Sequence, residues 1–266
     1  MSILFKNNKF LIVALFMLSP FVVNATVVEI RTSFGIIEVN LFDNTTPETV
    51  ANFLSYANSG SYANNVVHRS VSNFIIQGGG FTYTGPVAVN SFTLDSISTG
   101  TPVANDPKLS NLRGTIAMAK TSNPDSATSQ WFINLSNNAN SLDVASNAGG
   151  FTVFGQVVGD GMQVVDAIAA LTRLNGGGAF AEIPIRSYTQ TDVDNEVPIT
   201  DDNLVVISDI VVTNAAADTA ANLNPTLNTL VNSPPGGGGS DSGGGAIGWL
   251  LLLSLVILQR SRLLKR

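Results

Sequence analysis

The chain has 266 residues and no cysteine, which excludes disulfides, thiolate catalysis and cysteine-based zinc sites. Six of its thirteen basic residues lie in the two ends, so the remaining body carries 7 − 19 = −12, against a net charge of −6 for the whole chain. Such an acidic body lacks the positive surface that nucleic acid requires, and we expect no nucleic-acid partner.

The first 25 residues have the order of a secretory signal peptide. Lys6 and Lys9 precede an apolar run over residues 10–23, and Val23-Asn24-Ala25 provides a small-residue cleavage site. We therefore expect cleavage after Ala25 and export of the remainder. An uncleaved N-terminal anchor is the alternative, although the apolar run is short for a membrane span.

The body opens with patterns typical of a β-hairpin and an α-helix. Residues 26–42 alternate between apolar and polar on either side of a turn at Ser33-Phe34-Gly35. Thr45-Thr46-Pro47-Glu48 then offers a capping hydroxyl, a first-turn proline and an early carboxylate. Ser59-Gly60 ends the predicted helix, whose apolar stripe consists of Val50, Phe53, Leu54 and Ala57.

Short apolar runs bounded by turn residues make up most of the remaining body. They cover residues 74–76, 114–119, 130–135 and 151–158, and an amphipathic helix is predicted over residues 162–171. A last strand is expected over residues 204–212. This pattern favours a mainly β domain over residues 26–213, built as a closed antiparallel barrel with an α-helix covering each end.

A 31-residue stretch between Arg173 and Asn203 shows little periodicity, and a loop this long is either functional or mobile. It has several carboxylates that could hold calcium, namely Asp192, Asp194, Glu196, Asp201 and Asp202. They lack the order and the glycine of an EF-hand. We interpret the stretch as a solvated acidic loop, with a metal site as the less favoured alternative.

The most informative stretch is VVHRSVSNFIIQGGGF, residues 66–81, which holds the only histidine, His68, beside Arg69. One histidine allows at most one catalytic triad, and the chain has no G-x-S-x-G elbow. The three glycines precede no Lys-Ser pair and so form no phosphate-binding loop. An enzyme with these residues is expected to work without a nucleophile, metal or cofactor. Taken alone, Arg69 could equally form a surface ion pair.

Within that stretch, HRSVSNFIIQGGGF resembles the cyclophilin signature, in which a histidine–arginine pair is followed by phenylalanine, an apolar residue, glutamine and glycines. RGTIAMAKTSNPDSATSQWFIN (113–134) and FTVFGQVVGDGMQVVDAI (151–168) are similar to two further segments of that family, in the same order. The resemblance covers about residues 27–212 and is greatest to bacterial periplasmic members. It implies a peptidyl-prolyl cis–trans isomerase acting on proline-containing polypeptides, on an eight-stranded antiparallel barrel capped by two α-helices.

The resemblance also implies roles for individual residues. Arg69 would be the catalytic donor. The residues expected to bind substrate are His68, Phe74, Ile75, Gln77, Ala119, Lys120, Gln130, Phe132, Leu142 and Phe151. Phe74, Ile75, Phe132 and Leu142 would form the apolar floor and walls around the proline ring, as core-type residues left partly uncovered. Gln77 would bind the substrate backbone and orient Arg69, and Lys120 would act mainly through its main chain. Because isomerisation moves no proton, we interpret His68 as a hydrogen-bonded support rather than a general base.

Three positions depart from the family pattern. Ser141 stands where a tryptophan or phenylalanine is frequent, which puts cyclosporin sensitivity in doubt. Phe151 stands where a histidine is common, and bacterial members vary there. Trp131 replaces a frequent phenylalanine, and we expect it on the core side of its strand.

The end of the chain has a different composition. Residues 214–245 are expected to form a flexible linker that ends in SPPGGGGSDSGGG, followed by a thirteen-residue apolar run from Ala246 to Leu258 and a basic tail to Arg266. This arrangement resembles a GlyGly-CTERM sorting signal of Gram-negative bacteria, which implies transient membrane insertion and removal by a rhomboid-type protease. A plain C-terminal membrane anchor is the alternative. We expect a periplasmic or cell-surface protein.

Three functions remain open at this point. The leading one is an exported isomerase that assists protein folding. The second is a binding module that holds proline-containing segments with incidental turnover, and the third is a surface interaction protein that uses its acidic loop. The combination of Arg69, Phe74, Gln77 and Phe132 argues against an inactive barrel.

Overall fold

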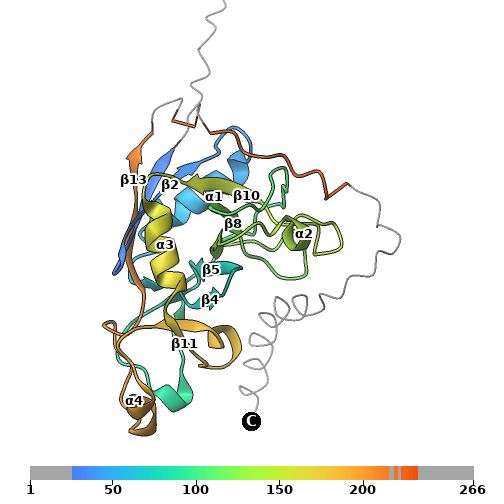
Figure 1. The fold of residues 1–266 in the computed structure, drawn as a ribbon. Helices are drawn as coiled ribbons and strands as arrows, with labels where there is room; N and C mark the ends of the chain where they lie inside the picture. Colours follow the sequence, from blue (N-terminus) through green and yellow to red (C-terminus); the bar gives the residue numbers. More distant parts are fainter. Residues whose placement is uncertain (1–25, 216–218, 221–222, 233–266) are drawn as a thin grey trace, which may run out of the picture.

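The structure is a computed structural model and describes residues 26–215, 219–220 and 223–232 (Figure 1). The expected signal peptide and the apolar C-terminal run lie outside these residues. Within the described residues, no helix is long and apolar enough to cross a membrane.

One curled antiparallel sheet dominates the molecule, with the strand order β4-β5-β9-β8-β10-β2-β1-β13-β3-β6-β7. Its strands are β1 (Val27–Thr32), β2 (Gly35–Leu41), β3 (Asn65–Val66), β4 (Arg69–Val71), β5 (Ile75–Gly78), β6 (Phe81–Thr82), β7 (Asp95–Ser96), β8 (Thr115–Met118), β9 (Trp131–Asn134), β10 (Val153–Val157) and β13 (Val206–Asn214). A separate two-stranded ribbon pairs β11 (Thr172–Leu174) with β12 (Ile183–Ile185). The mainly β prediction is confirmed, and full closure into a barrel stays a prediction.

The hairpin predicted over residues 26–42 is confirmed. β1 and β2 pair with Val28 opposite Val39 and Ile30 opposite Ile37. These four side chains are at most 1% exposed, as the alternation of the sequence predicts for the inner face of a sheet.

The two predicted α-helices are also present, as α1 (Pro47–Asn58) and α3 (Gly161–Ala169). One detail was wrong: the expected capping hydroxyl does not cap α1. The Thr46 hydroxyl donates instead to the carbonyl of Val153, 3.4 Å away, and so ties the start of the helix to β10. Two short α-helices that the sequence did not suggest are α2 (Ala139–Leu142) and α4 (Gln190–Asp194), and two 3-10 turns are η1 (Val89–Ser91) and η2 (Gly178–Phe180).

The main core lies between the curled sheet and the helices α1 and α3. Phe53 and Val50 of α1 and Val165 and Ile168 of α3 belong to one buried cluster with the inner residues of the sheet. Trp131 is fully buried in this cluster, so its expected place on the core side of β9 is confirmed. Burial of such large apolar side chains is the main stabilising contribution to the fold.

The stretch from Arg173 to Asn203 is not the irregular loop that we expected. It contains most of β11 and all of η2, β12 and α4, and in Figure 1 this part lies below β4 and β5, away from α1 and β10. A separate apolar cluster, which includes the buried Phe180, Ile183 and Ile185, holds this stretch in place. Asp192 forms a capping box with Thr189 at the start of α4, which lowers the pKa of this carboxyl. Among the described residues, no three carboxylate or imidazole groups gather as a metal site.

The expected linker is also partly built into the fold. Residues 223–232 run alongside the segment from Lys108 to Ser110, and Leu109 and Leu227 form an isolated antiparallel β-bridge between them. The amide of Ser110 donates to the carbonyl of Thr226 at 2.8 Å, and the amide of Asn228 donates to the carbonyl of Lys108 at 2.8 Å. The folded unit therefore extends beyond the expected boundary at residue 213.

Candidate functional site

A row of side chains crosses three neighbouring strands. Arg69 of β4 lies opposite Gln77 of β5, and Gln77 lies opposite Phe132 of β9. Directly opposed residues share one face of a sheet, so a cation, an amide and an aromatic ring are aligned on that face. The next residue in the row, Ala117 of β8, is small and fully buried.

The Arg69 guanidinium is held by two acceptors. Its Nη1 lies 3.5 Å from Oε1 of Gln77, and its Nε lies 3.5 Å from Oε2 of Glu182. The side chain is only 12% exposed. Burial lowers the pKa of Arg69, and the charge of Glu182 opposes that shift. An arginine remains charged under such conditions, so this is a fixed, partly desolvated cation.

Gln77 continues the row toward the next strand. Its side-chain amide donates to Oε1 of Gln130 at 2.8 Å, and Gln77 itself is buried. Gly80 accommodates Gln130, because a Cβ at position 80 would lie 2.7 Å from Cδ of Gln130. Gly79 has a φ of +82° and a Cβ there would lie 2.6 Å from the carbonyl of Ser129. These glycines therefore serve close packing and a turn.

His68 is buried beside this row, with the Val66 backbone and the Gln130 side chain as the polar groups near its ring. Neither ring nitrogen has a partner at hydrogen-bonding geometry. The ring instead packs edge-to-face against Phe81, with centroids 4.8 Å apart, and Phe180 lies 6.5 Å away. Burial lowers the pKa of His68 to about 4, the charge of Arg69 adds to the shift, and the nearby Val66 backbone and Gln130 side chain oppose it. His68 is therefore a neutral packing residue near pH 7.

The predicted apolar wall comes together in one cluster that contains Ile75, Ala119, Phe132, Leu142 and Phe151, with Phe74 packed against it. The expectation that these walls are partly uncovered was wrong for most of them. Ile75, Phe132, Leu142 and Phe151 are at most 2% exposed, whereas Phe74 is half-buried. The physical reason is local: the rings of Phe132 and Phe151 pack edge-to-face at 5.8 Å, so each covers the other.

Lys120 closes the other side of this wall with its side chain. Its Nζ donates to the carbonyl of Ala148 at 2.5 Å and lies 4.3 Å from the centroid of the Phe151 ring. Burial lowers the pKa of Lys120 to about 8, and Asp125 opposes the shift. Lys120 and Phe151 also line a hollow of about 480 Å³ between the segments at residues 120–124 and 145–151.

Behind the wall lies a chain of buried polar side chains that the sequence did not reveal, made of Asn138, Asn134, Asn111 and Asp143. At one end Asn138 donates to the carbonyl of Phe74 at 2.8 Å, and near the other Asn111 donates to the carbonyl of Phe151 at 3.1 Å. Buried polar groups that are hydrogen-bonded in this way fix a unique arrangement. The network therefore positions the floor and the wall together.

Residues 223–232 reach the same network. The side-chain amide of Asn228 donates to the carbonyl of Asp143 at 3.0 Å, and Leu223 packs against the apolar wall cluster. Asn228 is buried. Asp143 follows Leu142 directly, so this contact secures the segment that carries the wall.

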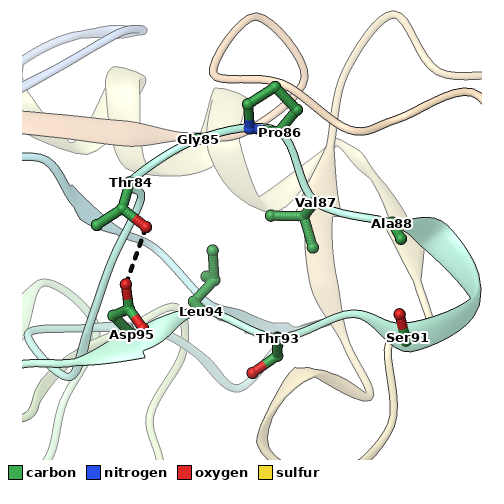
Figure 2. A pocket seen from close by; sticks show the side chains of 9 residues that line it. All are labelled: Thr84, Gly85, Pro86, Val87, Ala88, Ser91, Thr93, Leu94 and Asp95. Atoms are coloured by element: carbon green, nitrogen blue, oxygen red, sulfur yellow. Dashed lines mark hydrogen bonds between the residues drawn. The ribbon is translucent and has the colours of Figure 1, made fainter.

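A different hollow, of about 300 Å³, lies in the loop from Thr84 to Asp95 (Figure 2). Figure 2 shows Thr84 and Asp95 pointing toward one another across its base, where the hydroxyl of Thr84 donates to the carboxylate at 2.9 Å. None of the predicted site residues lines it. The residues expected to act together are instead those around Arg69 and the apolar wall.

Sequence reasoning missed Glu182 and Asn228. Glu182 stands between Phe180 and Ile183, which are both buried, so a charged residue inside an apolar run was the available signal. Asn228 carried no such signal, because it lies in a stretch whose composition is typical of a linker.

Comparison with known proteins agrees with this arrangement. Residues 27–190 match the family described as cyclophilin type peptidyl-prolyl cis-trans isomerase/CLD. A peptidyl-prolyl cis-trans isomerase of Acinetobacter baylyi is 44% identical over 146 residues, which cover 54% of this chain and 72% of the relative. Peptidyl-prolyl cis-trans isomerase A of Dickeya dadantii is 44% identical over 155 residues, covering 58% and 76%. Peptidyl-prolyl cis-trans isomerase B of Escherichia coli is 40% identical over 154 residues, covering 56% and 88%.

The family match covers more than half of the chain, and it includes both the arginine-bearing strand and the apolar wall. The chain therefore belongs to the cyclophilin-type peptidyl-prolyl cis–trans isomerases.

Proposed function

We propose that this isomerase works by aiming the Arg69 guanidinium at the prolyl nitrogen of a twisted X–Pro peptide bond. The peptide bond resists rotation with a barrier of about 18–20 kcal/mol because of its partial double-bond character. Its cis and trans X–Pro forms differ by only about 0.5–1 kcal/mol, so both are populated and exchange slowly. Catalysis must therefore stabilise the twisted state that lies between them.

In the twisted state the amide resonance is lost and the prolyl nitrogen regains a lone pair. A fixed cationic donor near that nitrogen binds the twisted state better than either planar state, which is the requirement for a rate increase. Each tenfold of rate needs about 1.36 kcal/mol of such preference. No covalent intermediate, metal or cofactor enters this mechanism.

The observation that carries the proposal is the aligned row of Arg69, Gln77 and Phe132 on one sheet face. It places a positioned cation on the same face as the aromatic ring proposed to receive proline. Gln77 contacts both Arg69 and Gln130, so it supports the orienting role proposed for it. We propose that Phe74, the least buried of the aromatic residues in the site, forms the accessible entrance to the proline site.

The test is an isomerase assay on an X–Pro peptide with wild type, Arg69→Ala and the control Arg31→Ala. Arg31 also pairs with carboxylates, Glu29 and Asp209, but it is 43% exposed and lies in β1. Removing one fixed donor costs roughly 10²–10³ in kcat, so we expect a loss of that order for Arg69→Ala and none for the control. Equal rates for Arg69→Ala and wild type would refute the mechanism. Negligible wild-type turnover with measurable peptide binding would favour a binding module.

The expected closure of the sheet into an eight-stranded barrel is a further part of this proposal. Only Val67 and His68 separate β3 from β4. The amide of Val67 donates to the carbonyl of Val205, and that of His68 to the carbonyl of Gln77, each at 3.0 Å. These bonds support one bent strand that joins the β13 side to the β5 side. Slow hydrogen exchange of both amides is expected, and fast exchange of both would contradict closure.

We also propose that the enzyme is exported to the periplasm or cell surface and that its C-terminal run inserts in the membrane at least transiently. The support is the sequence order at the two ends, with a small-residue site at Ala25 and a glycine-rich stretch before Ala246. Mass spectrometry of the mature protein tests both ends. A C-terminus near the glycine-rich stretch would support processing by a rhomboid-type protease, and an intact Arg266 in the membrane fraction would support an anchor.

A further inference from the structure

The partner of Arg69 on the side away from Gln77 comes from the stretch of residues 173–203. Glu182 lies between η2 and β12, and its Oε2 is 3.5 Å from Nε of Arg69. The side chain of Glu182 is 32% exposed and that of Arg69 is 12% exposed. The stretch that looked like a solvated acidic loop therefore brings one carboxylate to the proposed catalytic cation.

The backbone of Glu182 is anchored to the strand that carries Arg69. The amide of Ser70 donates to the carbonyl of Glu182 at 2.8 Å. On either side, Ile183 is fully buried and the ring of Phe180 packs on that of Phe81 with centroids 4.7 Å apart. An ion pair between two mobile surface side chains contributes little, because ordering them costs entropy. Here much of that ordering is already supplied by the fold.

Two acceptor groups lie 3.5 Å from different nitrogens of one guanidinium and limit its orientation. Glu182 faces Nε and Gln77 faces Nη1, and among the described residues Nη2 has no acceptor. Because the guanidinium is a rigid planar fork, holding one edge directs the other. The direction of the donor decides how well it stabilises a developing lone pair, and small misplacements of a catalytic group are costly.

We propose that Glu182 is a positioning residue that orients Arg69 for isomerisation, an inference that rests on the catalytic role proposed for Arg69. Glu182 acts through the arginine and not on the substrate. Its side-chain oxygen also supplies an acceptor to the partly buried guanidinium, so without it the arginine side chain would gain by turning toward water.

The experiment compares Glu182→Ala, Glu182→Gln and the control Glu196→Gln in the full chain, with kcat and KM measured on an X–Pro peptide. Glu196 lies on the same stretch but is exposed, so its substitution removes a charge without touching Arg69. Glu182→Ala is expected to lower kcat on the order of tenfold with little change in KM, since misorienting a catalytic group can cost up to about a hundredfold. Glu182→Gln keeps an acceptor oxygen for Nε and is expected to recover most of that loss.

A double-mutant cycle separates positioning from general destabilisation. If Glu182 acts through Arg69, adding Glu182→Ala to Arg69→Ala lowers the residual rate no further. An additive loss, a wild-type kcat for Glu182→Ala, or a loss confined to KM would each overturn the proposal. So would equal losses for Glu182→Gln and Glu182→Ala, which would point to charge and not orientation. Retained activity in Arg69→Ala alone would instead refute the proposed mechanism, and thermal melts of every variant check the fold.

Discussion

The two edges of the candidate site are held in different ways. We call Arg69 with its supporting residues 174–203 the arginine edge, and Leu142 and Phe151 with residues 223–232 the apolar edge. The arginine edge uses a carboxylate and an aromatic cluster, with Glu182 on the cation and Phe180 near His68. The apolar edge uses a buried network of asparagines and Asp143, and a lysine over a ring.

The difference follows from what each edge must present. A buried cation needs a compensating charge and a fixed direction. An apolar wall needs mainly shape, which the hydrogen-bonded asparagines and the buried Asp143 behind it supply. Residues 223–232, which support the apolar edge, lie outside the matched residues 27–190, whereas Glu182 and Phe180 lie inside them.

The largest expected effect is on the aromatic support of the arginine edge. Phe180 is 8% exposed and its ring packs against Phe81 and Phe92 at centroid distances of 4.7 and 5.2 Å. Phe180→Ala should lower the free energy of unfolding by about 3–5 kcal/mol through lost burial and a cavity. Leu227→Ala, at a site 66% exposed, is the control and should stay within about 0.5 kcal/mol of wild type. Urea unfolding measures both, and a change below 1 kcal/mol for Phe180→Ala would show that this support is dispensable.

The second effect concerns His68, on the same edge. Its folded pKa of about 4 lies below the ordinary value of 6.5. The unfolded chain therefore takes up a proton below pH 6.5 that the folded chain refuses, and stability is lost as the pH falls from 6.5 toward 4. The full loss is about 3 kcal/mol at 1.36 kcal/mol for each unit.

Because His68 is the only histidine in the chain, no other imidazole contributes to the pH dependence of stability. Urea unfolding of wild type and His68→Gln at pH 7 and pH 4.5 isolates its contribution from that of the carboxylates. The stability difference between the two proteins should shift in favour of the variant at the lower pH. A difference that does not change with pH would mean that the imidazole titrates normally and is not sealed in the fold.

Sequence reasoning succeeded where chemistry is local and failed where it depends on distant segments. The β1–β2 hairpin and the burial of Val28 and Ile30 follow from alternation, which short-range physics dictates. The cluster of Phe132, Leu142 and Phe151 could be predicted through the family resemblance. Its tight closure could not, because it depends on how rings from separate strands pack.

The two supports were missed for a related reason. Glu182 reaches Arg69 from 113 positions along the chain, since 182 − 69 = 113, and Asn228 reaches Asp143 from 85. Composition describes a segment by itself and says nothing of the surface on which it packs. Residues 223–232 therefore have the composition of a linker, although the buried Asn228 and the side chain of Leu223 join them to the site.

The third prediction tests the apolar edge through that asparagine. Asn228→Ala removes its bond to the carbonyl of Asp143 and the bonds that its Oδ1 accepts from the amides of Leu230 and Val231. A loss of about 1–3 kcal/mol in unfolding free energy is expected from the unsatisfied buried groups. KM should rise severalfold with kcat nearly unchanged, because the wall binds proline and does not rotate the bond. Asn224→Ala, at an exposed position of the same segment, is the matched control. A wild-type KM and stability for Asn228→Ala would show that the segment merely lies on the surface.

The smallest effect is expected for Lys120, which completes the apolar edge. Lys120→Met keeps most of the apolar stem but removes the bond to the carbonyl of Ala148 and the cation over Phe151. The cation–π contact contributes roughly 0.5–1 kcal/mol, so a twofold to fivefold rise in KM and a small loss of stability are expected. The measurement is the isomerase assay at several peptide concentrations. Lys108→Met is the control, because Lys108 is an exposed lysine whose ammonium pairs with Asp106. A fall in kcat instead of a rise in KM would place Lys120 with Arg69 and contradict the division of labour between the two edges.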